Sequence, residues 1–183
     1  MISRPRNARL RPAGFTLLEI ATVIVVIAIL LVMLVPAFDR LREKADKGTC
    51  ISNLRNLYGA TSAYVQQHGH WPQVDPKTIL TKKYAEGWIA ALEPFGITRK
   101  NWICPSVQRV LGGPDYSKPA HTRVDYLATS FDEHPYTPYR WPKQPWFAER
   151  ADLHGAGPIF IFTDGTIQEL RAAKRSGSGS GGN

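Results

Sequence analysis

One carboxylate, Glu19, lies at the start of a long apolar run. The residues that follow, from Ile20 to Phe38, include no charged side chain, and only Thr22 and Pro36 interrupt the apolar sequence. A charge near the centre of a bilayer costs about 2.5–3.5 kcal/mol on insertion scales. We therefore expect a group that compensates Glu19, and we expect the identity of that group to point to the function.

The other candidate groups for chemistry are histidines and one aspartate, spread from residue 68 onward. They are His68, His70, His121, His134, His154 and Asp164. His68 and His70 are two residues apart, which suits two metal ligands only in an extended segment. The chain has no His-Glu-x-x-His and no Cys-x-x-Cys pattern. We therefore assign no metal site and expect these histidines to lie at the surface or to form hydrogen bonds.

His154 and Asp164 could form a catalytic pair. No serine or cysteine nucleophile is placed by a motif such as Gly-x-Ser-x-Gly. We favour a structural role, in which His154 bonds the backbone of a hairpin. Asp164 and Gly165 would then be the two central residues of its turn, because both tolerate positive φ. We expect no enzymatic activity.

The two cysteines, Cys50 and Cys104, are compatible with a disulfide in an oxidising compartment. Cys50 falls in an expected helix and Cys104 in the domain after it, so a bond would join the two. Two cysteines do not show that a bond forms, and a pair of buried or unrelated thiols is the alternative.

An aromatic, proline-rich stretch extends from Tyr136 to Trp146. Its Arg140, Trp141 and Trp146 could bind DNA or a glycan by stacking. The alternative, which we favour, is a loop wrapped over the domain or a contact between subunits. We expect an ordered loop without a regular helix or strand.

The apolar run requires a membrane helix. Residues 15–38 number 24, and a bilayer core needs about 20 apolar residues. Pro36 should bend or loosen this helix. Residues 39–68 repeat apolar or small side chains every three or four positions, so we expect the helix to continue as an amphipathic segment packed on a globular head. These positions are Leu41, Ala45, Gly48, Ile51, Leu54, Tyr58, Thr61 and Val65.

The head should span residues 69–175. Gly69 and Pro72 end the long helix, and prolines cut the sequence up to residue 150 into short pieces. We expect a short helix at 78–84 or 86–92, a strand at 124–129, and an antiparallel hairpin formed by 159–163 and 166–171. Residues 176–183 are a Gly/Ser tail that should be flexible. The predicted fold class is therefore α+β.

Basic charge is concentrated at the N-terminus. The first 14 residues contain four arginines and no acid, and removing them lowers the formal charge from +8 to +4. We therefore do not expect nucleic acid as a partner. Arginine-rich flanks stay cytoplasmic, so the C-terminal domain should be exported.

The sequence Gly14-Phe15-Thr16-Leu17-Leu18-Glu19, with a basic leader before it and an apolar helix after it, resembles the cleavage and methylation signal of type IV prepilins and of type II secretion pseudopilins. Pro36 falls where helices of that family commonly carry a proline. The His-x9-Asp-Gly pattern from His154 to Gly165 is similar to a C-terminal signature of a large bacterial group of prepilin-like proteins. The pieces that begin at Cys50 and Cys104 are similar to that group's helix and mid-domain pieces.

The resemblance implies a pilin-like fold and cleavage between Gly14 and Phe15, followed by N-methylation of Phe15. The freed ammonium of Phe15 would pair with Glu19 of a neighbouring subunit and set the axial register. The implied function is a structural subunit of a type IV pilus-like or type II secretion pseudopilus filament. The alternative is a minor or tip pilin that binds DNA, a glycan or a secreted substrate through its aromatic loop.

The implied partners are copies of the chain or sibling pilins, a prepilin peptidase, and a membrane platform with its cytoplasmic ATPase. The chain would be a single-pass inner-membrane protein with a cytoplasmic N-terminus and a periplasmic head, before it enters a periplasmic pseudopilus or a surface pilus. Major pseudopilins as a class bind calcium in a C-terminal loop, but no matching acidic loop is evident. We assign no residue to calcium and expect no other cofactor.

Overall fold

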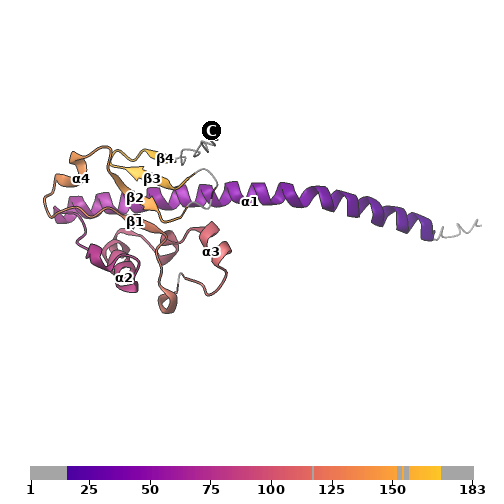
Figure 1. The fold of residues 1–183 in the computed structure, drawn as a ribbon, viewed down its shortest axis with the longest axis horizontal. Coiled ribbons are helices and arrows are strands. Elements are labelled where there is room, and N and C mark those ends of the chain that lie inside the picture. Colours follow the sequence, from indigo (N-terminus) through magenta and orange to yellow (C-terminus); the bar gives the residue numbers. More distant parts are fainter. Residues whose placement is uncertain (1–15, 117, 152–153, 155–156, 170–183) are drawn as a thin grey trace, which may run out of the picture. The chain divides into compact units, whose positions relative to one another are not determined.

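The computed structural model describes residues 16–116, 118–151, 154 and 157–169. The chain divides into two compact units, residues 1–41 and 42–183. One helix, α1 (Leu17–His68), begins in the first unit and ends in the second (Figure 1). The predictions of a leader, of cleavage between Gly14 and Phe15 and of a flexible tail at 176–183 concern residues outside the described part of the chain.

The first unit is the N-terminal part of α1. The helix begins with a capping box, in which Thr16 Oγ1 accepts the Glu19 N–H at 3.3 Å and Glu19 Oε2 accepts the Thr16 N–H at 2.9 Å. Apolar side chains from Leu17 to Val35 are exposed in the single chain. By length and composition the helix is able to cross a membrane, and it continues through position 36.

In the second unit, one face of α1 packs against the head, as its periodicity predicts. Its buried residues include Cys50, Leu54, Leu57, Thr61 and Val65. The predicted face began too early, because Leu41, Ala45 and Gly48 are exposed and packing starts only at Cys50. The predicted end of the helix is confirmed: Gly69 has φ +75°, and its N–H bonds the carbonyl of Val65 at 2.9 Å.

Short helices fill the segment between α1 and the sheet. They are 3-10 turns at Pro76–Thr78, Glu93–Phe95, Arg99–Trp102 and Pro119–His121, with α-helices α2 (Lys82–Leu92) and α3 (Pro105–Leu111). Helix α2 confirms a short helix that ends at Leu92, but it begins at Lys82, four residues before the second predicted range. It starts at Lys82 because the Thr81 hydroxyl accepts the Tyr84 N–H at 3.3 Å.

The C-terminal part of the head is a four-stranded antiparallel sheet in the order β1-β2-β3-β4, which confirms the predicted fold class. Its strands are β1 (Tyr126–Ala128), β2 (Pro145–Glu149), β3 (Ile159–Phe162) and β4 (Ile167–Glu169). The prediction of a loop without regular structure at 136–146 was wrong. A helical turn, α4 (Thr137–Arg140), lies there, and β2 begins at Pro145.

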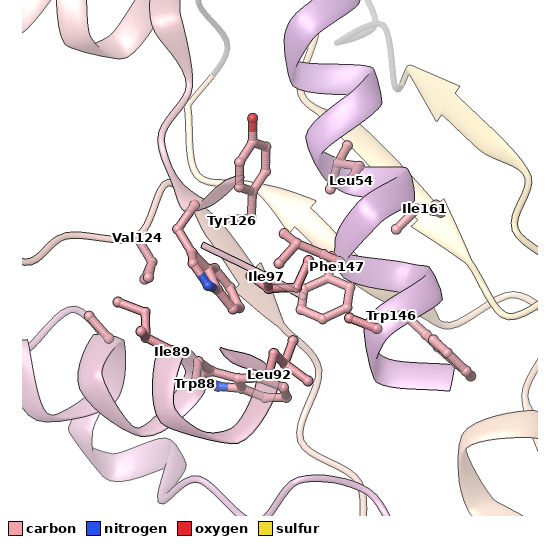
Figure 2. Packing of buried hydrophobic residues seen from close by; sticks show 14 of the residues in the cluster. Leu54, Trp88, Ile89, Leu92, Ile97, Val124, Tyr126, Trp146, Phe147 and Ile161 are labelled. Atoms are coloured by element: carbon pink, nitrogen blue, oxygen red, sulfur yellow. The ribbon is translucent and has the colours of Figure 1, made fainter. Parts of the chain in front are cut away.

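The core joins α1, α2 and the sheet (Figure 2). Four tryptophans are almost fully buried in it: Trp71, Trp88, Trp102 and Trp146. Trp71 meets Trp146 edge to face, with ring centroids 5.0 Å apart. A register shift between Pro145 and Phe147 lets the neighbouring Trp146 and Phe147 both reach the core. Large aromatic side chains therefore compensate for the short helices and strands of the head.

The β3–β4 turn differs from the predicted two-residue turn. Ile161 pairs with Ile167, and the Phe162 N–H bonds the Thr166 carbonyl at 2.9 Å. Three residues, 163–165, therefore form the loop. Only Gly165 has a positive φ, +77°. Asp164 instead accepts the Thr166 N–H through Oδ1 at 2.9 Å. A three-residue loop with glycine in the left-handed region is a common alternative to the two-residue turn.

Candidate functional site

Four buried side chains that can bind metals meet inside the head. They are Cys50, Cys104, Glu149 and His154, and we call them the cysteine–histidine cluster. One ligand atom from each lies within 4.8 Å of every other. The Cys50 and Cys104 residues are 0% and 2% exposed, and the side chains of His154 and Glu149 are 1% and 2% exposed. Within the described residues, this is the strongest concentration of chemically reactive groups.

Different elements bring these four residues together. Cys50 is the first buried residue on the packed face of α1. Cys104 caps the start of α3, and its N–H donates to Asp125 Oδ2 at 2.8 Å. Glu149 ends β2 two residues after the buried Phe147, so strand alternation turns both toward the core. The Ile159 N–H donates to Glu149 Oε2 at 3.1 Å. This bond leaves Oε1 directed at the rest of the cluster.

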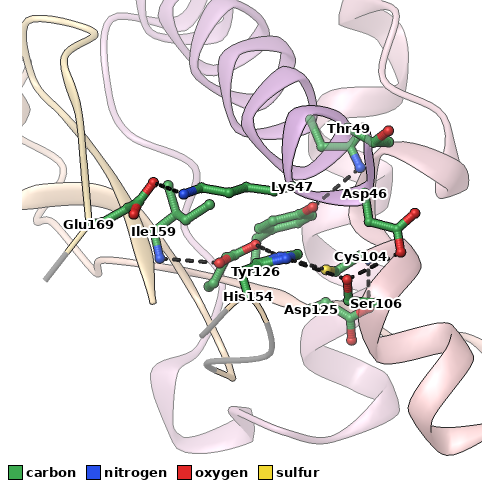
Figure 3. Close-up of polar contacts among 12 residues, drawn as sticks. Asp46, Lys47, Thr49, Cys104, Ser106, Asp125, Tyr126, His154, Ile159 and Glu169 are labelled. Carbon is green, nitrogen blue, oxygen red and sulfur yellow. Dashed lines mark hydrogen bonds and ion pairs between the residues drawn. The ribbon is translucent and has the colours of Figure 1, made fainter. Parts of the chain in front are cut away.

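His154 lies in the segment between β2 and β3, and both of its ring nitrogens have neighbours (Figure 3). Nδ1 lies 3.4 Å from Ser106 Oγ, which donates its own hydrogen to Asp46 Oδ2 at 3.3 Å. When Ser106 donates to Asp46, its oxygen accepts from His154, and the proton of a neutral imidazole is then on Nδ1. The lone pair of Nε2 then faces Cys104 Sγ at 3.5 Å and Glu149 Oε1 at 3.3 Å.

Burial and mutual contact set the protonation of the cluster. The Cys50 thiol donates to Cys104, which lowers the pKa of Cys104 and raises the pKa of Cys50. Burial raises the pKa of Glu149, and His154 opposes that effect when its ring is charged, because the cation stabilises the nearby carboxylate. Glu149 Oε1 receives no hydrogen bond of good geometry from the described residues. The cluster therefore brings two sulfurs, a carboxylate oxygen and an imidazole nitrogen together in a buried space.

The structure separates two residues that the sequence suggested as a pair. His154 contacts Cys104, Ser106 and Glu149, whereas Asp164 is exposed and bonds the backbone of Thr166. No hydrogen bond or ion pair joins His154 to Asp164 among the described residues. The expected hydrogen bond from His154 to the hairpin backbone is also not formed among the described residues.

The two cysteines are free thiols in this structure. Both are buried, as the alternative of two buried thiols held, and their sulfur atoms lie within 4.8 Å of each other. The disulfide stays a prediction.

The remaining histidines do not gather into a site within the described residues. His68, His121 and His134 are exposed, and His70 is half-buried against the Trp71 carbonyl. The rings of His68 and His70 are 6.2 Å apart between centroids. The expectation of surface or hydrogen-bonding histidines therefore holds for these four.

The aromatic segment places its proposed ligand-binding residues differently from the prediction. Trp146 is fully buried in β2 and donates from Nε1 to the Pro138 carbonyl at 3.0 Å, so it cannot stack on a ligand. Arg140 and Trp141 are exposed. Arg140 lines an open hollow of about 560 Å³ beside α4, together with Asp132, His134, Tyr136, Thr137 and Tyr139.

Two residues of the site were missed in the sequence. Glu149 was not considered because β2 was not predicted, and Ser106 has no motif around it. The signal that would have found Glu149 is its place in the run Pro-Trp-Phe-Ala-Glu, where alternation puts a carboxylate on the same face as Phe147.

The chain is similar to secretion proteins of several bacteria. It is 35% identical over 99 aligned residues to the type II secretion system core protein G of Pectobacterium carotovorum subsp. carotovorum, covering 47% of this chain and 64% of that protein. Identity to the Klebsiella pneumoniae protein of the same name is 38% over 65 residues, covering 36% and 46%. Identity to the Escherichia coli K12 protein is 42% over 59 residues, covering 32% and 41%.

These alignments are partial, since the chain spans between 41% and 64% of the length of these relatives. No protein-family model matches the chain. No solved structure matches it at a significant level.

Proposed function

We propose that this pseudopilin-like chain is a structural subunit of a type II secretion pseudopilus or of a related type IV pilus-like filament, and not an enzyme. The observation that carries the proposal is α1, whose apolar side chains from Leu17 to Val35 are exposed in the single chain. The similarity to core protein G of three bacteria favours the pseudopilus over other filaments.

Such a large exposed apolar surface must be buried by lipid or by another protein. A monomeric soluble protein rarely exposes contiguous apolar patches larger than a few hundred Å². The charge-free run from Ile20 to Phe38 fits a bilayer before assembly. Neighbouring α1 helices would replace the lipid after assembly, because packed apolar helices bury the same surface. The same segment would thus serve as membrane anchor and as filament core.

Glu19 supplies the specificity of this assembly in our proposal. Its Oε2 accepts two bonds from Thr16, one from the backbone N–H at 2.9 Å and one from the hydroxyl at 3.1 Å. Oε1 has no hydrogen-bond partner among the described residues. It is therefore open to the ammonium of Phe15 in a neighbouring subunit. Such a pair would relieve two charges within an apolar bundle and fix the stagger between subunits.

The processing and location follow from the same proposal. A prepilin peptidase would cut between Gly14 and Phe15 and methylate Phe15. A membrane platform and its cytoplasmic ATPase would then extract the subunit. The arginine-rich leader would hold the N-terminus in the cytoplasm, and the head would lie in the periplasm.

The test compares Glu19→Gln with Glu43→Gln in the native host. Glutamine keeps the capping box but removes the charge, so Glu19→Gln should be cleaved and methylated normally yet yield no filaments. Glu43 lies on the same helix outside the apolar run, and its variant should assemble. Intact mass, N-terminal analysis and imaging of sheared filaments give the readout. Normal filaments from Glu19→Gln would contradict the proposed pairing of Glu19 with Phe15. An uncut wild-type chain would contradict the filament proposal.

A second candidate function is ligand binding at the tip of a filament through the hollow beside α4. The exposed Tyr136 and Trp141 favour it, at 73% and 55% exposed. A double change of Arg140 and Trp141 to alanine should then abolish salt-sensitive binding of DNA or a glycan and leave filaments intact. Unchanged binding would exclude this surface.

A further inference from the structure

We propose that the cysteine–histidine cluster is a structural site for a divalent transition metal, with zinc as the preferred ion. The four ligands would be the two cysteine sulfurs, Oε1 of Glu149 and Nε2 of His154. This inference does not depend on the filament assignment, because it uses only residues of the head.

Two of the six ligand–ligand distances in the cluster match a tetrahedral zinc site, and all six are at most 4.8 Å. With Zn–N, Zn–O and Zn–S bonds of about 2.0–2.3 Å, the nitrogen and a sulfur lie about 3.6 Å apart and the nitrogen and an oxygen about 3.4 Å apart. The corresponding distances here are 3.5 Å from His154 Nε2 to Cys104 Sγ and 3.3 Å to Glu149 Oε1. Two ligand–ligand distances of the tetrahedron are therefore already present without the ion.

The surroundings hold each ligand as a metal site requires. Histidine ligands usually donate their other N–H to an oxygen that is itself fixed. Nδ1 of His154 faces Ser106 Oγ, Ser106 donates to Asp46, and Asp46 pairs with Arg109. This relay fixes the tautomer that presents the Nε2 lone pair to the metal.

The other ligands are oriented in the same way. The Ile159 N–H holds Glu149 Oε2 at 3.1 Å and leaves Oε1 toward the cluster. The Tyr126 hydroxyl lies beside the sulfur of Cys50 and is itself held by Asn53 Nδ2 at 3.3 Å. Each ligand thus has a support outside the cluster.

The donor set selects the ion. Two thiolates and an imidazole suit zinc and other soft or borderline ions, whereas calcium and magnesium require oxygen ligands. Each thiol releases its proton on binding, and the loaded site carries a net charge of about −1, the same as a three-cysteine, one-histidine zinc site.

A disulfide between Cys50 and Cys104 is the competing state. It would consume both sulfurs and leave Glu149 Oε1 with His154 Nε2, 3.3 Å away, as its remaining neighbour in the cluster. A bound cation satisfies all four groups at once. The complete burial of the ligands gives a closed site, which is typical of structural zinc and leaves no position for substrate. The metal would join α1 to the start of α3 and to the sheet.

The experiment uses the full chain in detergent, purified from native membranes without added chelator or reductant. We expect one zinc per chain by mass spectrometry of the metal. X-ray absorption should show two sulfurs at about 2.3 Å and two lighter atoms at about 2.0–2.1 Å. Replacement by Co²⁺ should give a thiolate-to-cobalt charge-transfer band. Ca²⁺ should not displace either ion.

Variants connect the metal to these residues. Cys50→Ser, Glu149→Gln and His154→Ala should each lower zinc affinity by more than about 100-fold, whereas His121→Ala, a change of an exposed histidine, should not alter it. Glu149→Gln keeps the shape of the side chain, so we expect this variant to fold. Its zinc affinity can therefore be measured even if His154→Ala does not fold. A metal-free chain with a Cys50–Cys104 peptide in non-reducing mapping would overturn the proposal. Zinc that survives both Glu149→Gln and His154→Ala would also overturn it.

Discussion

The hydroxyl of Tyr58, on α1, donates a hydrogen bond of 2.8 Å to the carbonyl of Thr163 in the β3–β4 turn. The ring of Tyr58 also packs on Trp146, with centroids 4.7 Å apart. Gly165 approaches the same ring so closely that an added Cβ would lie 3.3 Å from Tyr58 Cε1. Tyr58 therefore attaches the β3–β4 hairpin to α1 by a hydrogen bond and by ring packing.

Removing the Tyr58 hydroxyl should lower stability modestly. We expect Tyr58→Phe to reduce the free energy of unfolding by about 1 kcal/mol, because the partly buried Thr163 carbonyl loses its donor while the ring contacts stay. Denaturant unfolding of the full chain in detergent, followed by tryptophan fluorescence, measures the change, since all five tryptophans lie in the second unit. Tyr136→Phe, at an exposed position, is the control. Equal midpoints for both variants would mean that water replaces the Tyr58 bond.

Two glycine substitutions should shift stability in opposite directions. Gly165→Ala should destabilise by about 1–2 kcal/mol, because φ is +77° and the Tyr58 ring limits relaxation. Gly59→Ala should stabilise by up to about 1 kcal/mol, because Gly59 lies inside α1 with nothing within 4 Å of its added Cβ. Unfolding midpoints of the two variants and wild type provide the comparison. A shift of the same sign for both variants would contradict this account of the turn.

The long helix and the terminal hairpin were predictable because local rules determine them. The charge-free run, the three-and-four spacing from Ile51 to Val65, and Gly69 all act within a few residues. The middle of the head was not predictable in the same way. Prolines there suggested a loop, yet β2 forms because Trp146 and Phe147 fill the core and Glu149 pairs opposite Tyr126. Packing between distant residues overrode local propensity.

The site was harder to foresee than the fold. His154 was singled out, but two of its partners lie 48 and 50 residues away, and the third lies on a strand that the sequence did not reveal. From the sequence, Cys50 and Cys104 were considered only as a disulfide pair and not together with His154. Glu149 and His154 are five residues apart, but no short spacing connects them to Cys50 or Cys104, so only the fold brings the four residues together.

Buried and exposed tryptophans of the aromatic segment should respond differently to the same substitution. Trp146→Phe should cost about 1–3 kcal/mol, because it removes the Nε1 bond to Pro138 and leaves space beside Trp71. Trp141→Phe should change stability by less than about 0.5 kcal/mol, since Trp141 is exposed. Thermal and denaturant midpoints measure both. A loss of stability in Trp141→Phe as large as that in Trp146→Phe would show that the aromatic segment packs differently.

Ser106 tests the relay behind the proposed metal site without touching a ligand. Ser106→Ala removes the acceptor for the His154 Nδ1–H, while Asp46 keeps its pair with Arg109. We expect zinc affinity, measured by competition with a chromophoric chelator, to fall about 10–100-fold. The unfolding midpoint of the metal-free chain should change by no more than about 1 kcal/mol.

The control for this prediction is Ser62→Ala. The Ser62 hydroxyl also donates a hydrogen bond, here to the Tyr58 carbonyl at 2.9 Å, but Ser62 lies on α1 and is not part of the relay. Its variant should keep wild-type zinc affinity. If Ser106→Ala lowers stability strongly in the metal-free chain and leaves affinity unchanged, then Ser106 supports packing alone. A selective loss of affinity would instead show that the orientation of the His154 ring matters, because packing by itself does not distinguish one tautomer from the other.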